Sequence, residues 1–127
     1  MPDVKILKTD DCAPAFGGAM KLVRDSLGVQ SFGIQVIDMP PNADAYPEHD
    51  HSEDGQEEVY TVLNGACTLI VGGEEHNLEP DMFARVGPNE TRKIVTKDKP
   101  VRLLALGAAP GKAYEIIDFT RAQPQNV

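Results

Sequence analysis

Short stretches in which apolar and polar residues alternate dominate the middle of the chain, and turn residues separate them. Residues 58–63, 66–71, 74–78, 82–86, 92–95 and 101–106 each fit the pattern of a strand. Between them, Gly72-Gly73 and Gly87-Pro88-Asn89 are typical of turns. Strands this short and this closely spaced predict an all-β domain, either a sandwich or a small antiparallel barrel.

Two hairpins are expected from the turn residues. Asn64-Gly65 stands between 58–63 and 66–71, and an Asn-Gly pair tolerates the positive φ angles of a tight turn. Residues 21–27 fit a short helix or a strand by composition. We expect a strand, because Gly28 follows directly and the alternating segment 31–39 comes next, so that the two segments would pair.

The ends of the chain carry weaker signals. Residues 4–7 give a weak strand pattern, and residues 114–119 fit an edge strand. At 127 residues and 13.8 kDa the chain is expected to form one domain. We divide it into an N-terminal arm (1–20), a barrel (21–107) and a C-terminal extension (108–127).

The charge of the chain is negative and unevenly distributed. The net charge is −8, and no Lys or Arg occurs between Arg24 and Arg85. Such a surface repels phosphate backbones, so we expect no nucleic-acid partner. The segment 44–58 would attract divalent cations with its seven carboxylates, which are Asp44, Glu48, Asp50, Glu53, Asp54, Glu57 and Glu58.

Composition also bears on the location of the protein. No apolar run approaches the roughly 20 residues of a membrane span, and the first residues do not form a secretory leader. Cys12 and Cys67 are the only cysteines, which implies no disulfide framework. We therefore expect a cytoplasmic protein that does not associate with membranes.

The strongest candidate chemistry is a pair of histidines one residue apart. His49 and His51 lie in an alternating segment, and residues i and i+2 of a strand point to the same face. Glu58 opens the next strand after the polar turn 52–56, and this strand could lie beside the first. Two imidazoles and a carboxylate are suitable ligands for iron, manganese, zinc or nickel.

The run from Tyr46 to Ile94 resembles the small single-domain cupins. Their first motif is two histidines one residue apart, a glutamate, and a glycine seven residues after it, and these positions fall on His49, His51, Glu58 and Gly65. Glu57 competes with Glu58, but the spacing and the strand phase favour Glu58. The resemblance covers residues 30–107 and implies a jelly-roll barrel, or double-stranded β-helix, with those three side chains as metal ligands.

The second motif of that family departs from its usual form here. Pro80-Asp81 stands where Gly-Asp is common, and by count the place of the fourth ligand, a histidine, falls on Thr91 with Arg92 beside it. An arginine cannot ligate a metal and a neutral Thr hydroxyl ligates weakly. The sequence therefore predicts a set of two histidines and one carboxylate with open positions, and a weakly bound divalent metal.

A substrate pocket can be outlined from strand phase. Tyr60 shares the face of Glu58, and Phe83 shares a face with Arg85 on another strand. An inward Arg or Lys near the metal would favour a small anionic ligand. The expected pocket residues are Tyr60, Phe83, Arg85, Thr91, Arg92 and Lys93.

Two functions fit these residues, and no catalytic acid or base is predicted. The first is a metal-dependent enzyme, of oxygenase or isomerase type, that acts on a small anionic molecule. The alternative is a non-catalytic module that senses or binds a small molecule without a tightly bound metal. Edge strands at 4–7 or 114–119 could pair with a second copy, so a homodimer is also expected.

Overall fold

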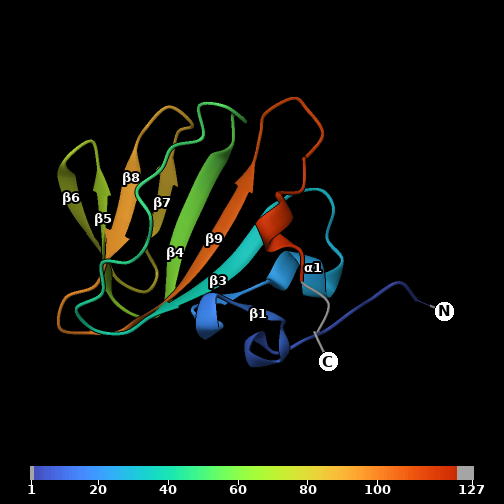
Figure 1. The fold of residues 1–127 in the computed structure, drawn as a ribbon, viewed down its shortest axis with the longest axis horizontal. Helices are drawn as coiled ribbons and strands as arrows, with labels where there is room; N and C mark the ends of the chain where they lie inside the picture. Colours follow the sequence, from blue (N-terminus) through green and yellow to red (C-terminus); the bar gives the residue numbers. More distant parts are fainter. Residues whose placement is uncertain (1, 123–127) are drawn as a thin grey trace.

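Two antiparallel sheets pack against each other and form a barrel in the computed structural model, which describes residues 2–122 (Figure 1). One sheet has six strands in the order β1-β2-β3-β9-β4-β7, and the other has three in the order β6-β5-β8. The expected jelly-roll barrel is confirmed. The strands are β1 (Pro14–Ala15), β2 (Met20–Lys21), β3 (Gly33–Met39), β4 (Glu57–Gly65), β5 (Cys67–Val71), β6 (Glu74–Leu78), β7 (Phe83–Val86), β8 (Arg92–Val95) and β9 (Val101–Ala108).

The core fills the space between the sheets and follows the alternation of each strand. Ile37 of β3, Leu103 of β9 and Val62 of β4 lie in one register row and point inward. Leu69 and Ile94 meet them from the second sheet and are fully buried. Only the alternate residues of β3, β4 and β9 enter this core, so their sequence phase determines which side chains face the barrel interior.

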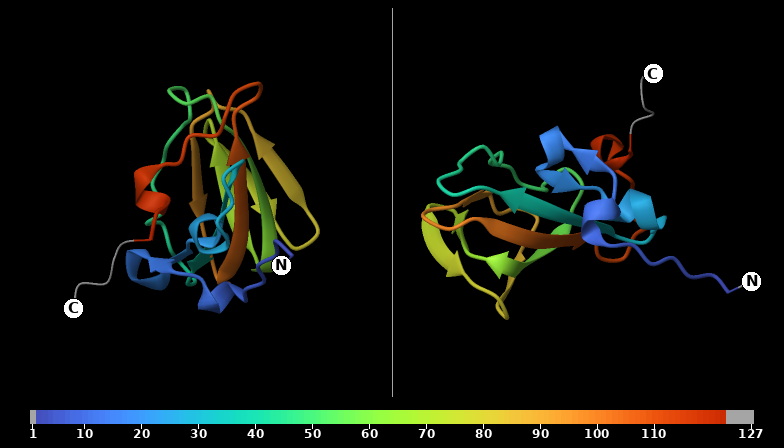
Figure 2. Two further views of the ribbon diagram at one scale, coloured as in Figure 1. Left: turned by 90° about the vertical axis from the view of Figure 1, so that its right-hand side faces the viewer. Right: turned by 90° about the horizontal axis from the view of Figure 1, so that it is seen from below.

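The short helix α1 (Val23–Leu27) packs against β3 of the large sheet (Figures 1 and 2). The strand expected over 21–27 is therefore wrong, because only Met20 and Lys21 pair with β3. Gly28 ends the helix with a φ of 80°, and its N–H donates to the carbonyls of Arg24 and Asp25. A glycine in this left-handed conformation is a common helix terminator, so it marked a helix end and not a hairpin turn.

The hairpin expected at Asn64-Gly65 is also wrong. These two residues extend β4 and pair with Arg102 and Val101 of β9, beyond a bulge that follows Val62. The chain then crosses to β5, which belongs to the other sheet. Gly65 makes this possible because its φ is 84° and its α-carbon lies against the Pro100 carbonyl. The Asn-Gly pair therefore serves as a crossing between sheets.

The strands expected over residues 4–7 and 114–119 do not form. Val4 and Ile6 are exposed and unpaired in the sheets, and residues 114–119 contain only part of η3 (Asp118–Thr120). Two further 3-10 turns, η1 (Thr9–Asp11) and η2 (Phe16–Gly18), lie in the N-terminal part. The expected C-terminal extension is described to residue 122, and 123–127 lie outside the described part. Among residues 2–122, no helix has the length and apolar character needed to cross a membrane.

A Gly65→Ala change should strongly destabilise the barrel. A β-carbon at residue 65 would lie 1.9 Å from the Pro100 carbonyl oxygen, and the positive φ adds strain. We expect a loss of more than about 3 kcal/mol in the free energy of unfolding, measured by urea denaturation. Gly72→Ala is the control, since Gly72 has a φ of 55° and open space around it, and it should cost about 1 kcal/mol. Equal losses would contradict the steric role of Gly65.

A second prediction concerns an ion pair on the outer face of the large sheet. Arg102 Nε and Nη2 donate to the two carboxylate oxygens of Asp38 at 2.8 and 3.0 Å, and Lys21 Nζ lies 3.3 Å away. The hydrogen bonds from Arg102 lower the pKa of Asp38 although partial burial acts to raise it. A carboxylate whose pKa is lowered on folding stabilises the protein above its unfolded pKa, and this contribution disappears as the pH falls.

Asp38→Asn should therefore reduce the free energy of unfolding by about 1 kcal/mol at neutral pH, since the pair is partly exposed. The difference from the unchanged protein should shrink below about pH 4, where the carboxylate of the unfolded chain becomes protonated. Urea denaturation at several pH values measures both quantities. Asp98→Asn, at an exposed loop position, serves as the control. A difference that stays constant down to about pH 2 would contradict the linkage.

Candidate metal centre

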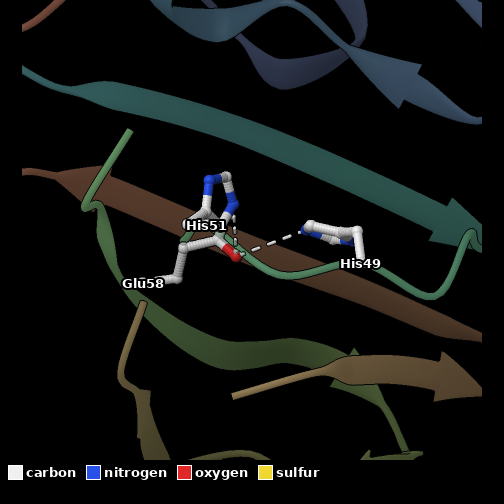
Figure 3. A group of neighbouring side chains, drawn as sticks. All are labelled: His49, His51 and Glu58. Carbon is white, nitrogen blue, oxygen red and sulfur yellow. Dashed lines mark ion pairs between the residues drawn. The ribbon is translucent and has the colours of Figure 1, made fainter. Parts of the chain in front are cut away.

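Three side chains meet at one end of the barrel, which we call the mouth, where β4 begins and β9 ends (Figure 3). The backbone of His49 exchanges two hydrogen bonds with Arg92, at 3.0 and 2.8 Å, and the His51 N–H donates to the Pro88 carbonyl. The histidine segment therefore lies beside β8 of the small sheet, whereas Glu58 belongs to the large sheet. The sequence correctly predicted that these residues meet, but they come from opposite sheets and not from adjacent strands.

The ligand atoms of the three side chains lie close together. Glu58 Oε1 lies 3.7 Å from His49 Nε2 and 3.2 Å from His51 Nε2. The three candidate ligand atoms all lie within 4.8 Å of one another. Ligand atoms about 2.1 Å from a shared metal are separated by roughly 3.0–3.4 Å in octahedral or tetrahedral geometry, so these distances suit a metal after small shifts.

Hydrogen bonds orient both imidazoles toward Glu58. His49 Nδ1 contacts the Pro47 carbonyl at 3.0 Å, and His51 Nδ1 contacts both carboxylate oxygens of Asp54 at 3.0 Å. Acceptors at both Nδ1 atoms favour the tautomer that leaves Nε2 with a free lone pair, the arrangement common to metal-binding histidines. His51 Nε2 is buried and lies 3.2 Å from Glu58 Oε1, so a proton or a metal ion is needed between the two atoms. The donor set therefore fits a divalent transition metal.

Arg92 occupies the remaining side of the cluster. Its side chain is fully buried, and its guanidinium donates to Glu58 Oε1, to the Gly87 carbonyl at 2.7 Å and to the Glu90 carbonyl at 3.1 Å. Sequence counting placed the missing fourth ligand at Thr91. The structure shows Thr91 exposed and the buried Arg92 side chain paired with Glu58, so Arg92 and not Thr91 enters the cluster.

Two tyrosines complete the polar network around the carboxylate. The Tyr60 hydroxyl donates to Glu58 Oε1 at 2.6 Å and accepts from the Tyr46 hydroxyl at 3.2 Å. Burial, together with the nearby Glu58 charge, raises the pKa of both tyrosines, so they remain protonated donors. Sequence phase correctly placed Tyr60 on the face of Glu58.

The ionisable groups of the cluster stabilise each other's charged forms. Burial acts to raise the pKa of Glu58, but contacts with His49, His51 and Tyr60 outweigh it and hold that pKa below its ordinary value. The Glu58 carboxylate raises the pKa of His51 against the opposing effect of burial, and Asp54 adds to the rise. In the absence of a metal, the cluster therefore favours a Glu58 carboxylate beside a protonated His51.

The other predicted pocket residues do not join the cluster. Phe83 and Arg85 pair with Thr61 and Val59 of β4, on the opposite face from Glu58, and Phe83 is 77% exposed. Arg85 forms an ion pair with Glu57 on the barrel exterior. Lys93 follows Arg92 directly on β8, so strand alternation places it on the outer face.

Two residues of the site were missed from the sequence. Tyr46 precedes the histidine motif in a stretch without strand periodicity, so nothing placed its hydroxyl near Glu58. Asp54 lies three residues after His51 in a polar turn, and its carboxylate also accepts from the Gln56 N–H at 3.0 Å. A carboxylate close in sequence to a histidine was an available signal for an orienting partner.

A cavity of about 590 Å³ lies away from the cluster, at the opposite end of the barrel. Asp38, Gly65, Val101 and Arg102 line it, and none of the three candidate ligands does. Its charged groups are already paired with each other, as described above. The candidate metal ligands therefore lie at the mouth and not at this cavity.

Residues 35–107 match the family described as Cupin domain, and the chain belongs to this family. A cupin protein from Bacteroides fragilis has a similar structure, with a TM-score of 0.72, 22% sequence identity, and coverage of 99% of this chain and 100% of the other. A sugar phosphate isomerase of the cupin superfamily from Silicibacter pomeroyi DSS-3 gives a TM-score of 0.67 at 22% identity, covering 90% and 83%.

The DMSP lyase DddQ from Ruegeria pomeroyi DSS-3 gives a TM-score of 0.56 at 25% identity. The matched region is 65% of this chain but only 41% of the lyase. No curated protein matches the chain. These comparisons establish the cupin fold, and the site residues described above carry the functional argument.

Arg92→Met should destabilise the protein, because it leaves the Glu58 carboxylate in the mouth without its guanidinium partner. Removing one member of a buried ion pair typically costs about 3–5 kcal/mol. We expect a loss of this size in the free energy of unfolding of the metal-free protein, measured by urea denaturation at neutral pH. Arg85→Met breaks the exposed pair with Glu57 and should cost less than about 1 kcal/mol. A loss at residue 92 no larger than this control would contradict the importance of the buried pair.

Proposed function

We propose that this cupin binds a divalent transition metal, namely iron, manganese, zinc or nickel, through His49, His51 and Glu58. The observation that carries the proposal is the arrangement of the imidazoles. Both Nδ1 atoms contact acceptors, and both Nε2 atoms face the same carboxylate oxygen. A hydrogen-bonded pair of histidines with converging free nitrogens is what a metal site requires.

The site would act on a small anionic molecule. Three protein ligands leave open positions, and a bound metal would polarise an oxygen of the ligand or activate oxygen. Arg92 adds a buried positive charge beside these positions, which favours an anion such as a carboxylate. Isomerase and lyase activities are named for the structurally similar cupins, and an isomerase, lyase or oxygenase reaction would each fit three ligands with open positions.

The protein residues have distinct tasks in this proposal. Tyr60 holds Glu58 in place by donating to Oε1, and Tyr46 supports Tyr60. Asp54 and the Pro47 carbonyl fix the tautomers of the two histidines. The cytoplasmic location and the homodimer remain predictions from the sequence.

One observation favours the alternative of a non-catalytic binding module. Arg92 already neutralises Glu58, so the cluster forms a satisfied charge network without a metal. The positive charge of Arg92 also opposes the entry of a metal cation beside Glu58. In this case the mouth would bind an anionic small molecule directly, without turnover.

Metal binding by purified protein separates the two functions. We expect about one metal per chain after loading with the four metals in turn, measured by elemental analysis and by titration. His49→Ala and His51→Ala should each weaken binding by at least about 100-fold. His76→Ala is the control, because His76 is exposed on β6, and it should bind like the unchanged protein.

Circular dichroism establishes that each variant keeps its β fold. An unchanged protein that binds none of the four metals would rule out the metal-dependent function and favour the binding module. Full metal content in both His49→Ala and His51→Ala would place the metal elsewhere in the molecule.

A further inference from the structure

A carboxamide without partners lies inside the barrel. Gln35 of β3 is 8% exposed, and both its side-chain nitrogen and its side-chain oxygen are buried. Neither atom has a hydrogen-bond partner within residues 2–122. A buried amide without partners costs free energy that an apolar side chain would not. Ile37 and Met39, which follow on the same face of β3, are apolar core residues, so packing alone does not require a glutamine here.

Strand register places Gln35 in the same inner row as the tyrosine of the metal centre. Gln35 pairs with Ala105 of β9, and Ala105 pairs with Tyr60 of β4. Two strand spacings separate the backbones of Gln35 and Tyr60, which is roughly 10 Å. Ala105 carries only a methyl group, so no long side chain stands between them on the sheet.

The next row toward the mouth contains two glycines. Gly33 pairs with Gly107, and Gly107 pairs with Glu58. Side chains from other segments lie over this strip. The Tyr114 hydroxyl lies 2.7 Å from where a β-carbon of Gly33 would be, and Gln56 Oε1 lies 2.7 Å from the equivalent point at Gly107. Polar side chains therefore cover the strip of sheet between Gln35 and Glu58.

We infer that Gln35 is a ligand-positioning residue, and that the ligand is a small carboxylate with a hydroxyl group at its other end. The carboxylate would lie at the cluster of His49, His51, Glu58 and Arg92, and the hydroxyl would contact Gln35. A carboxamide offers a donor and an acceptor side by side, and a hydroxyl is both an acceptor and a donor. The placement of the carboxylate rests on the proposed function, whereas the role of Gln35 rests on its own lack of partners.

Thermal unfolding of the metal-free protein tests the role of Gln35 without any ligand. A buried amide whose only partner is a bound ligand destabilises the ligand-free protein. Gln35→Met and Gln35→Leu should therefore raise the melting temperature by several degrees. Gln30→Met, at an exposed position, is the control and should leave it unchanged. A lower melting temperature in both Gln35 variants would show that the amide is a structural group, and would overturn the inference.

Calorimetric titration of the metal-loaded protein tests the ligand class. The probes are 3-hydroxypropanoate, 4-hydroxybutanoate and 5-hydroxypentanoate, each compared with the same acid without its hydroxyl. We expect at least one hydroxylated probe to bind about 10-fold more tightly than its parent acid, since a matched hydrogen bond to a buried group discriminates strongly. Gln35→Met should remove this preference while metal binding and the affinity for the parent acid persist, and Gln30→Met should retain it.

The two failures are distinguishable. A protein that binds no metal, but whose Gln35 variants melt at a higher temperature, would refute the proposed metal function and leave the role of Gln35 standing. A protein that binds metal but shows no preference for a hydroxyl, or keeps the preference in Gln35→Met, would overturn the inference and leave the metal centre intact.

Discussion

One carboxylate oxygen holds the functional end of this barrel together. Glu58 Oε1 accepts from Arg92 and from Tyr60, and it faces the Nε2 atoms of both histidines. Glu58 belongs to the large sheet, whereas Arg92 and the histidine segment belong to the small sheet, so this oxygen links the two layers across the mouth. A buried carboxylate is costly unless it is paired and hydrogen-bonded, and here every neighbour serves that requirement.

Most of the barrel could be predicted because strand alternation is a local property. The segments from β4 to β9 and the strand β3 follow from the spacing of apolar residues, and the cupin resemblance then supplied their arrangement. The errors came where one local signal has two meanings. Gly28 can open a hairpin or end a helix, and it ends α1. Asn64-Gly65 fits a tight turn, but the Pro100 carbonyl approaches Gly65 so closely that the pair continues β4.

The site was predictable to the extent that it depends on strand phase. His49, His51 and Glu58 meet, and Tyr60 shares the face of Glu58 because the two residues alternate along β4. Phe83 and Arg85 were assigned to the interior because the register between β7 and β4 is not readable from sequence. That register pairs them with the outward residues Thr61 and Val59. Tyr46 and Asp54 lie in irregular segments, where no period indicates the direction of a side chain.

The two backbone hydrogen bonds between His49 and Arg92 have a consequence for the geometry of the site. Pairing with β5 fixes the alternation of β8, which turns the side chains of Arg92 and Ile94 into the barrel and that of Lys93 outward. Arg92 therefore acts twice, because its backbone fixes the place of His49 while its side chain meets Glu58. One residue thus ties the imidazole segment of one layer to the carboxylate of the other.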